Sequence, residues 1–246
     1  MKKGDVIDRI GENHITNEGY TVEIIECCSS KNCTIRFGNG VIIENKEYRD
    51  IKRGVIKNPY HLSVCGVGYL GVGKHNNKAH LKVYNTWVEM LKRCYSKKHQ
   101  EKHPTYIKCS VAEEWHNFQN FVEWYDENYI EGYHLDKDIL VKGNKIYSPE
   151  TCCFVPIQIN SLLVKCNKVR GKCPIGVHKV GNKFQSQLTI NCNKVYLGFF
   201  NTPEEAFQSY KIAKEKEIKI VADKWKDKIS PQVYMALNNY KVEITD

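Results

Sequence analysis

One alternating stretch near the C-terminus carries side chains whose chemistry suits the edges of nucleic-acid bases. Residues 184–189 read Phe-Gln-Ser-Gln-Leu-Thr, and such alternation predicts a strand with one buried and one exposed face. The exposed positions would be Gln185, Gln187 and Thr189. A Gln amide can bond adenine at two atoms, and a Lys such as Lys194 can reach guanine acceptors or phosphates.

The charge around this stretch is one-sided. The 246-residue chain has a net charge of +9, yet it contains no Asp or Glu between Ser161 and Pro203. A basic segment attracts polyanions, of which nucleic acid is the commonest, although it can also serve solubility alone. The basic residues of the interval are Lys165, Lys168, Arg170, Lys172, Lys179, Lys183 and Lys194.

The elements that must position these side chains follow from turn and cap signals. Residues 175–180, 183–190 and 194–199 are predicted strands, separated by turns at Gly181-Asn182 and at residues 191–193. Thr202-Pro203-Glu204-Glu205 predicts a helix start with a capping box. Ser230-Pro231 predicts a last short helix.

This order resembles the APETALA2-type DNA-binding domain of plant ethylene-response factors and many phage proteins, over about residues 170–225. The resemblance implies a three-stranded sheet that enters the major groove. Several of the implied contact positions hold Arg or Trp in plant members but His, Thr, Lys or Tyr in this chain, which weakens any inference about the DNA sequence that is recognised. The alternative to DNA binding is a small sheet-and-helix module that packs on a neighbouring domain. The matching segments are Ile175-Gly176-Val177-His178, Lys183-Phe184, residues 195–200 and residues 202–206, and the implied DNA contacts are His178, Gln187, Thr189, Lys194 and Tyr196.

A second zone, residues 82–163, is similar to phage HNH-type homing endonucleases, which often carry such a sheet module at their C-terminus. Two matching zones in the same order are more specific than either zone alone. The residues that carry the similarity are Trp87, Met90, residues 93–95, Trp115, Phe118, Phe121, residues 135–138, residues 147–152 and Asn160.

The HNH resemblance implies a hairpin and a helix that grip one divalent metal, with a His as general base. Lys137 stands at that His position, and a protonated lysine cannot accept a proton. His134 would face the opposite side of the strand. The resemblance places Mg²⁺ or another divalent ion on Asp136 and Asn160. The alternative to a metal site is that Asp136 and Asp138 only cap the hairpin or face solvent.

Composition excludes several classes of protein. No apolar run approaches the ~20 residues of a membrane span, and the N-terminus lacks the apolar core of a secretory signal. We therefore expect a cytoplasmic protein of a bacterial host cell, with no membrane partner. The eleven cysteines include no Cys-x-x-Cys pair, so we expect no zinc finger and predict reduced, buried thiols.

The sequence predicts an α+β chain with four segments. Residues 1–60 form a small β domain, 61–81 a glycine-rich connector, 82–164 a degenerate HNH-like domain, and 170–246 the APETALA2-like domain with its C-terminal helix. Within the HNH-like segment, helices are predicted from Tyr84 and through Trp115, followed by a hairpin that turns at Gly143-Asn144. A short helix is predicted to start at Ser148-Pro149.

The leading functional hypothesis is a phage or mobile-element protein that binds double-stranded DNA while its HNH-like domain is catalytically impaired. Lys165, Lys168 and Arg170 would hold phosphates. Gln185 would contact DNA from the exposed sheet face, together with the residues that the APETALA2 resemblance implies. One alternative is a metal-dependent endonuclease or nickase, in which Lys137 stabilises charge on the phosphate. A second alternative is an interaction protein that inhibits a host protein.

Overall fold

The computed structural model describes residues 8–163, 173–191 and 193–245. Its contacts divide the chain into two units: Met1–Ile107 with Val111–Glu123, and Lys108–Ser110 with Trp124–Asp246. The predicted phosphate contacts Lys165, Lys168 and Arg170 lie outside the described residues. Within the described ranges, no helix combines the length and apolar character needed to cross a membrane.

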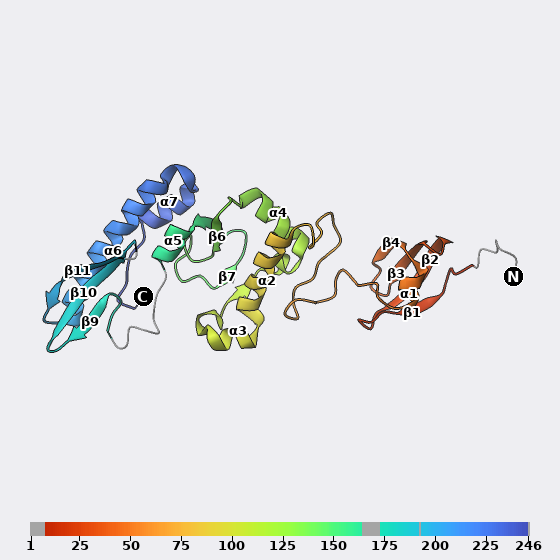
Figure 1. The fold of residues 1–246 in the computed structure, drawn as a ribbon, viewed down its shortest axis with the longest axis horizontal. Coiled ribbons are helices and arrows are strands. Elements are labelled where there is room, and N and C mark those ends of the chain that lie inside the picture. The colour runs from red at the N-terminus through yellow and green to blue at the C-terminus, as the bar shows by residue number, and fades with distance from the viewer. Residues whose placement is uncertain (1–7, 164–172, 192, 246) are drawn as a thin grey trace. The chain divides into compact units, whose positions relative to one another are not determined.

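The first unit begins with an antiparallel four-stranded sheet in the order β1-β2-β3-β4 (Figure 1). Its strands β2 and β3 contain the alternating residues 21–25 and 34–37. Alternating apolar residues of β2 and β3 bury one face against Ile51 of α1. The bounds are β1 Asn13–Ile15, β2 Thr21–Ser29, β3 Asn32–Phe37, β4 Ile42–Lys46 and α1 Tyr48–Lys52.

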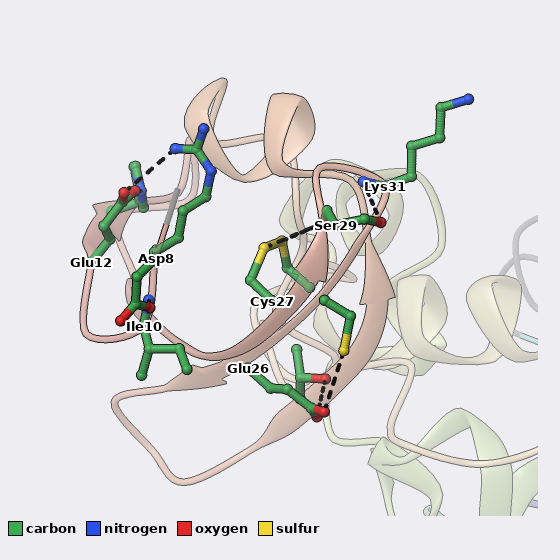
Figure 2. The surroundings of a disulfide bond; sticks show 12 residues. Asp8, Ile10, Glu12, Glu26, Cys27, Ser29 and Lys31 are labelled. Carbon is green, nitrogen blue, oxygen red and sulfur yellow. Dashed lines mark hydrogen bonds and ion pairs between the residues drawn. A yellow bond between two sulfur atoms is a disulfide. The ribbon is translucent and has the colours of Figure 1, made fainter. Parts of the chain in front are cut away.

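A disulfide joins β2 to β3. Cys27 and Cys33 are cross-strand partners with their Cα atoms 4.0 Å apart, and their sulfur atoms are bonded (Figure 2). The expectation of reduced thiols is therefore wrong for these two residues. Their pairing depends on the register of the hairpin, which spacing in the sequence does not reveal.

The rest of the first unit is helical around an aromatic core. The predicted helix from Tyr84 is confirmed as part of α2 (Leu81–Tyr95), and the one through Trp115 is a 3₁₀ turn (Glu113–His116) followed by α4 (Phe118–Asn128). Between α2 and the turn at Glu113–His116, the chain forms the short helix α3 (Lys97–Lys102) and a 3₁₀ turn (Pro104–Tyr106). The core of these helices is aromatic, because Trp87, Trp115, Phe118 and Phe121 are at most 1% exposed.

The glycine-rich segment packs closely on these helices. Gly68 lies so near the side chains of Trp87 and Leu91 that an added Cβ would collide with both. The Gln119 side chain donates to the carbonyl of Leu70 at 2.9 Å. The backbone of Tyr69 also exchanges hydrogen bonds with residues 116 and 118. The glycine-rich segment is thus an ordered loop that packs against the helices of the first unit.

The second unit contains a hairpin whose strands are β6 (Tyr133–Asp136) and β8 (Cys153–Pro156), followed by α5 (Ile157–Leu162). The sequence prediction of a helix at Ser148-Pro149 is wrong. That segment makes one turn, closed by the Cys152 N–H donating to the Ser148 carbonyl at 2.9 Å. The short strands β5 (Ser110–Val111) and β7 (Ile146–Tyr147) pair with each other through Ser110.

The C-terminal part of this unit is a three-stranded antiparallel sheet in the order β11-β10-β9, packed on the helix α6 (Figure 1). The predicted strands and the Thr202–Glu205 capping box are confirmed. The bounds are β9 Val177–Val180, β10 Lys183–Ile190, β11 Asn193–Phe200, α6 Pro203–Trp225, a 3₁₀ turn Lys226–Lys228 and α7 Pro231–Asn238.

One apolar core holds the second unit together. Val155 of β8 and Ile159 of α5 belong to the same buried cluster as Leu188 of β10 and Phe207 of α6. All four side chains are at most 3% exposed. The hairpin–helix segment and the sheet–helix segment therefore share a core, and each depends on the other for burial of its apolar face.

Candidate functional site

The side of the sheet opposite α6 carries all six candidate side chains that the sequence assigned to it. Directly opposed residues in antiparallel strands point to the same side. Gln185 opposes His178 and Phe199, Gln187 opposes Tyr196, Thr189 opposes Lys194, and Val180 opposes Lys183. We call this surface the outer face, and its residues are His178, Val180, Lys183, Gln185, Gln187, Thr189, Lys194, Tyr196 and Phe199.

The inner side of the sheet explains why the outer face points away from the protein. Ser186 and Leu188 alternate with the outer-face residues of β10 and are buried against the core. Gly176 precedes β9 with φ +76°, and a Cβ there would collide with the Tyr210 ring on α6. Glycine allows both this backbone conformation and the close approach of the sheet to the helix.

A β-bulge in β11 brings two aromatic rings together on the outer face. The register with β10 shifts between Ser186 and Gln187, so that Gly198 opposes the first and Tyr196 opposes the second. Leu197 is the additional residue. As a result, Tyr196 and Phe199 share a face although strict alternation would separate them, and their ring centroids lie 5.6 Å apart.

Polar groups on the outer face have little competition from within the protein. On the described part of this face, the Gln187 amide nitrogen lies 2.6 Å from Nε2 of His178. In this contact the Gln187 amide nitrogen is the donor and the His178 ring nitrogen the acceptor. Lys183 and Lys194 add positive charge and are exposed. Because this part of the chain has no acidic residue, the charge of the face is uncompensated along the strands.

The region that resembles an HNH site is arranged differently. Lys137 is only 5% exposed, and its ammonium donates to the Asp138 carboxylate at 2.7 and 2.8 Å and to the Asn144 carbonyl at 2.7 Å. The Asn144 side chain in turn donates to the carbonyls of Lys137 and Ile146. Lys137 therefore ties together the loop that follows β6.

Asp136 caps the same loop. One carboxylate oxygen accepts from the backbone N–H groups of Asp138 at 2.7 Å and Ile139 at 2.8 Å. Burial raises the pKa of the Asp136 carboxyl, and the two backbone hydrogen bonds only partly oppose the rise. Burial also raises the pKa of the Cys152 thiol to about 12. Cys153, which opposes Asp136 across the hairpin, has its pKa raised for the same reason.

These residues do not fit a divalent metal. A carboxylate that binds a cation should be anionic and open, whereas the Asp136 oxygen is engaged by backbone N–H groups and burial favours its neutral form. The neighbouring groups are neutral thiols and the Lys137 ammonium. Asn160 is half-buried on α5. Nowhere in the described ranges do three or more His, Cys, Asp or Glu side chains gather as a metal site would require.

The structure adds three residues to the outer face that the sequence did not single out as contacts. Lys183 and Val180 lie at the β9–β10 end, and Phe199 lies beside Tyr196. Alternation from Gln185 back to Lys183 could have identified the lysine. Phe199 could not be found this way, because its position depends on the bulge. His134 is exposed on β6 and takes no part in the Lys137 network.

Compared with known proteins, the chain matches no family model, no curated protein and no solved structure. The arrangement of the outer face and of the Lys137 loop is therefore what bears on function.

Proposed function

We propose that this protein binds double-stranded DNA by placing the outer face of the β9–β10–β11 sheet in the major groove. A two- or three-stranded antiparallel ribbon has a suitable width for that groove. The protein is proposed to be of phage or mobile-element type, following the order of its two resemblances. Its DNA binding would be carried by the second unit.

One observation carries this proposal: a sheet face with amides, lysines and aromatic rings points away from the core in a stretch of chain without acidic residues. Amides and lysines are the side chains that bond base edges and phosphates in the major groove. A face that only stabilised the fold would be covered, as the opposite face is covered by α6.

The HNH-like segment is proposed to serve as a scaffold without catalysis. The strand–strand–helix order of β6, β8 and α5 agrees with the HNH resemblance. The position of the general base, however, holds a buried lysine that is bound to Asp138 and Asn144. Since Val155 and Ile159 complete the core beneath α6, the segment would remain necessary for DNA binding even without cutting.

The first experiment is a native gel of supercoiled plasmid with purified full-length protein and Mg²⁺ or Mn²⁺, in which half of each sample is stripped of protein before loading. We expect a retarded band that returns to intact supercoil after stripping. Nicked or linear DNA in the stripped lanes would contradict the proposed loss of catalysis. Absence of any shift at low salt would contradict DNA binding.

A pair of matched variants tests the surface itself. Gln187→Ala combined with Lys194→Ala removes one amide and one charge from the outer face. Gln208→Ala combined with Lys216→Ala removes the same groups from exposed positions on α6. We expect the first variant to lose about tenfold or more in duplex affinity, and the second to change little. Equal losses in the two variants would contradict the sheet-face model.

A further inference from the structure

We infer that the outer face selects A·T base pairs, with its glutamines bonding adenine and its aromatic rings contacting the 5-methyl group of thymine. This inference rests on the proposed DNA binding and names the base pairs that the face would recognise. It follows from how amides and rings are paired across the strands.

Each outer-face glutamine of β10 lies directly opposite an aromatic residue of β11. Gln187 opposes Tyr196, and Gln185 opposes Phe199. Directly opposed side chains on one face of an antiparallel pair are nearest neighbours. The bulge in β11 is what makes this double pairing, since it returns Phe199 to the face that Tyr196 occupies.

An A·T pair presents a matching pattern in the major groove. Adenine offers N7 as acceptor and its N6 amino group as donor, and thymine adds an acceptor and a methyl group on the same edge. A Gln amide supplies one donor and one acceptor for adenine. A ring beside that amide can cover the thymine methyl group.

The rings have no structural reason to be on this face. Tyr196 is 54% exposed and Phe199 is 51% exposed, and Val180 near the other end of the face is 46% exposed. Exposed apolar groups clustered with polar ones are typical of a binding surface. The absence of acidic residues from the strands matches a polyanionic partner, because a like-charged surface would repel it.

The face also lacks the side chain that most often reads guanine. Arg bonds guanine O6 and N7 with a fixed pair of donors, and no Arg occurs in β9, β10 or β11. The cations on the face are Lys183 and Lys194, which sit at the ends of the Gln–aromatic pairs. These positions suit phosphate contacts on either side of the bases.

The test compares three duplexes of equal length with the full-length protein by fluorescence anisotropy. They are an A·T-rich duplex, the same duplex with uracil in place of thymine, and a G·C-rich duplex. Replacing thymine by uracil removes only the 5-methyl group. We expect the A·T-rich duplex to bind tightest, and the uracil duplex to bind about fourfold more weakly for each buried methyl group lost.

Phe199→Ala assigns the methyl contact to its ring. This variant should lose the part of the thymine preference that its own ring provides, about fourfold for one methyl group, while Tyr196 keeps the rest, so that the Phe199 and uracil losses are not additive. Ile212→Ala is the matched control, because it removes an exposed apolar side chain (70% exposed) from α6, and it should keep the full thymine preference. A second probe, 7-deazaadenine, removes the adenine N7 acceptor and should weaken binding of the wild type more than binding of Gln187→Ala, in which only Gln185 still bonds adenine.

The outcomes separate this inference from the proposed function. Binding that is equal for the thymine, uracil and G·C-rich duplexes would overturn A·T selection and leave DNA binding intact, and the rings would then belong to a contact with a protein. A thymine preference that is undiminished in Phe199→Ala would also overturn the assignment. Absence of binding to every duplex would defeat the proposed function itself.

Discussion

The loop after β6 and the outer face of the C-terminal sheet are both rich in polar side chains, but they use them in opposite ways. In the loop, the ammonium of Lys137 and the carboxylate of Asp136 bond to groups only a few residues away. On the described part of the outer face, the side-chain hydrogen bond is the one between Gln187 and His178. The polar groups of the loop are therefore bonded to other groups of the loop, whereas most polar groups of the outer face remain available to a binding partner.

The difference indicates which property each region should control. Removing a buried, satisfied group leaves its partners unsatisfied and lowers stability. Removing an exposed group changes stability little and affects whatever the surface binds. Substitutions in the loop should therefore be measured as unfolding free energies, and substitutions on the face as affinities. Four predictions test this division.

The largest effect should come from the core that the two regions share. Ile159→Ala on α5 removes a fully buried side chain and should destabilise the second unit by about 2–5 kcal/mol. Hydrogen exchange of the β10 amides is the measurement, because β10 carries the outer face and shares the buried cluster with Ile159 of α5. Ile157→Ala on the same helix is the control, since Ile157 is 62% exposed. Unchanged β10 exchange in Ile159→Ala would show that the two regions fold independently.

The next effect should come from Lys137. Lys137→Met keeps the buried stem but removes the ammonium that bonds Asp138 and Asn144. We expect a loss of about 2 kcal/mol in the unfolding free energy of the second unit, with duplex affinity nearly unchanged. Lys216→Met, at an exposed position on α6, should have no such cost. A large loss of DNA affinity in a Lys137→Met protein of normal stability would place Lys137 in the binding surface instead.

Asp136 should give a smaller effect that depends on pH. Its pKa is raised by burial above the ordinary value of 3.8, so the folded state holds the proton more tightly than the unfolded state does. The stabilising contribution of this proton is present at low pH and is lost as pH rises through the window between the ordinary and the raised value.

Asp136→Asn removes this titration, and its amide oxygen can still accept from the two backbone N–H groups. The stability of the variant relative to wild type should therefore improve as pH rises through that window and then level off. Urea unfolding at a series of pH values from acid to neutral would measure it. A relative stability that declines with rising pH would mean that the buried carboxylate is preferred as an anion.

The smallest effect on stability should come from the outer face. Lys194→Ala at an exposed position should change the unfolding free energy by less than about 0.5 kcal/mol. If Lys194 contacts a phosphate, the logarithmic salt dependence of duplex binding should decrease by about one unit of slope. An unaltered slope would remove Lys194 from the phosphate contacts.

Local signals in the sequence predicted a large part of the second unit. The bounds of β10 and the cap formed by Thr202 and Glu205 agree with the structure, because alternation and capping depend on residues close in the chain. The orientation of Ser186 and Leu188 toward the helix is likewise confirmed.

Features that depend on partners distant in the chain were not predictable in this way. The pairing of β6 with β8, the Cys27–Cys33 bond and the close packing of Gly68 on Trp87 each require knowledge of register or tertiary approach. For the candidate site, sequence alternation found the residues of β10 but missed Phe199. It also could not show that Lys137 is buried among acceptors from its own loop.

The bulge in β11 has a consequence for how this strand can vary. Polar or bulky replacements should be tolerated at the outward positions Lys194 and Tyr196, which are two residues apart. Because of the bulge at Leu197 and Gly198, the next tolerant position should be Phe199, three residues after Tyr196. Gly198, with φ +131°, occupies the place where the phase changes and where a side chain would be strained. Deleting Leu197 would remove the bulge, yet strict alternation would then still place Phe199 outward and Phe200 inward, because the shorter segment compensates for the lost bulge. With the length unchanged, a strand without the bulge would instead turn Phe199 toward the core and Phe200 toward solvent, so the number of residues in this short segment determines the surface as much as their identity.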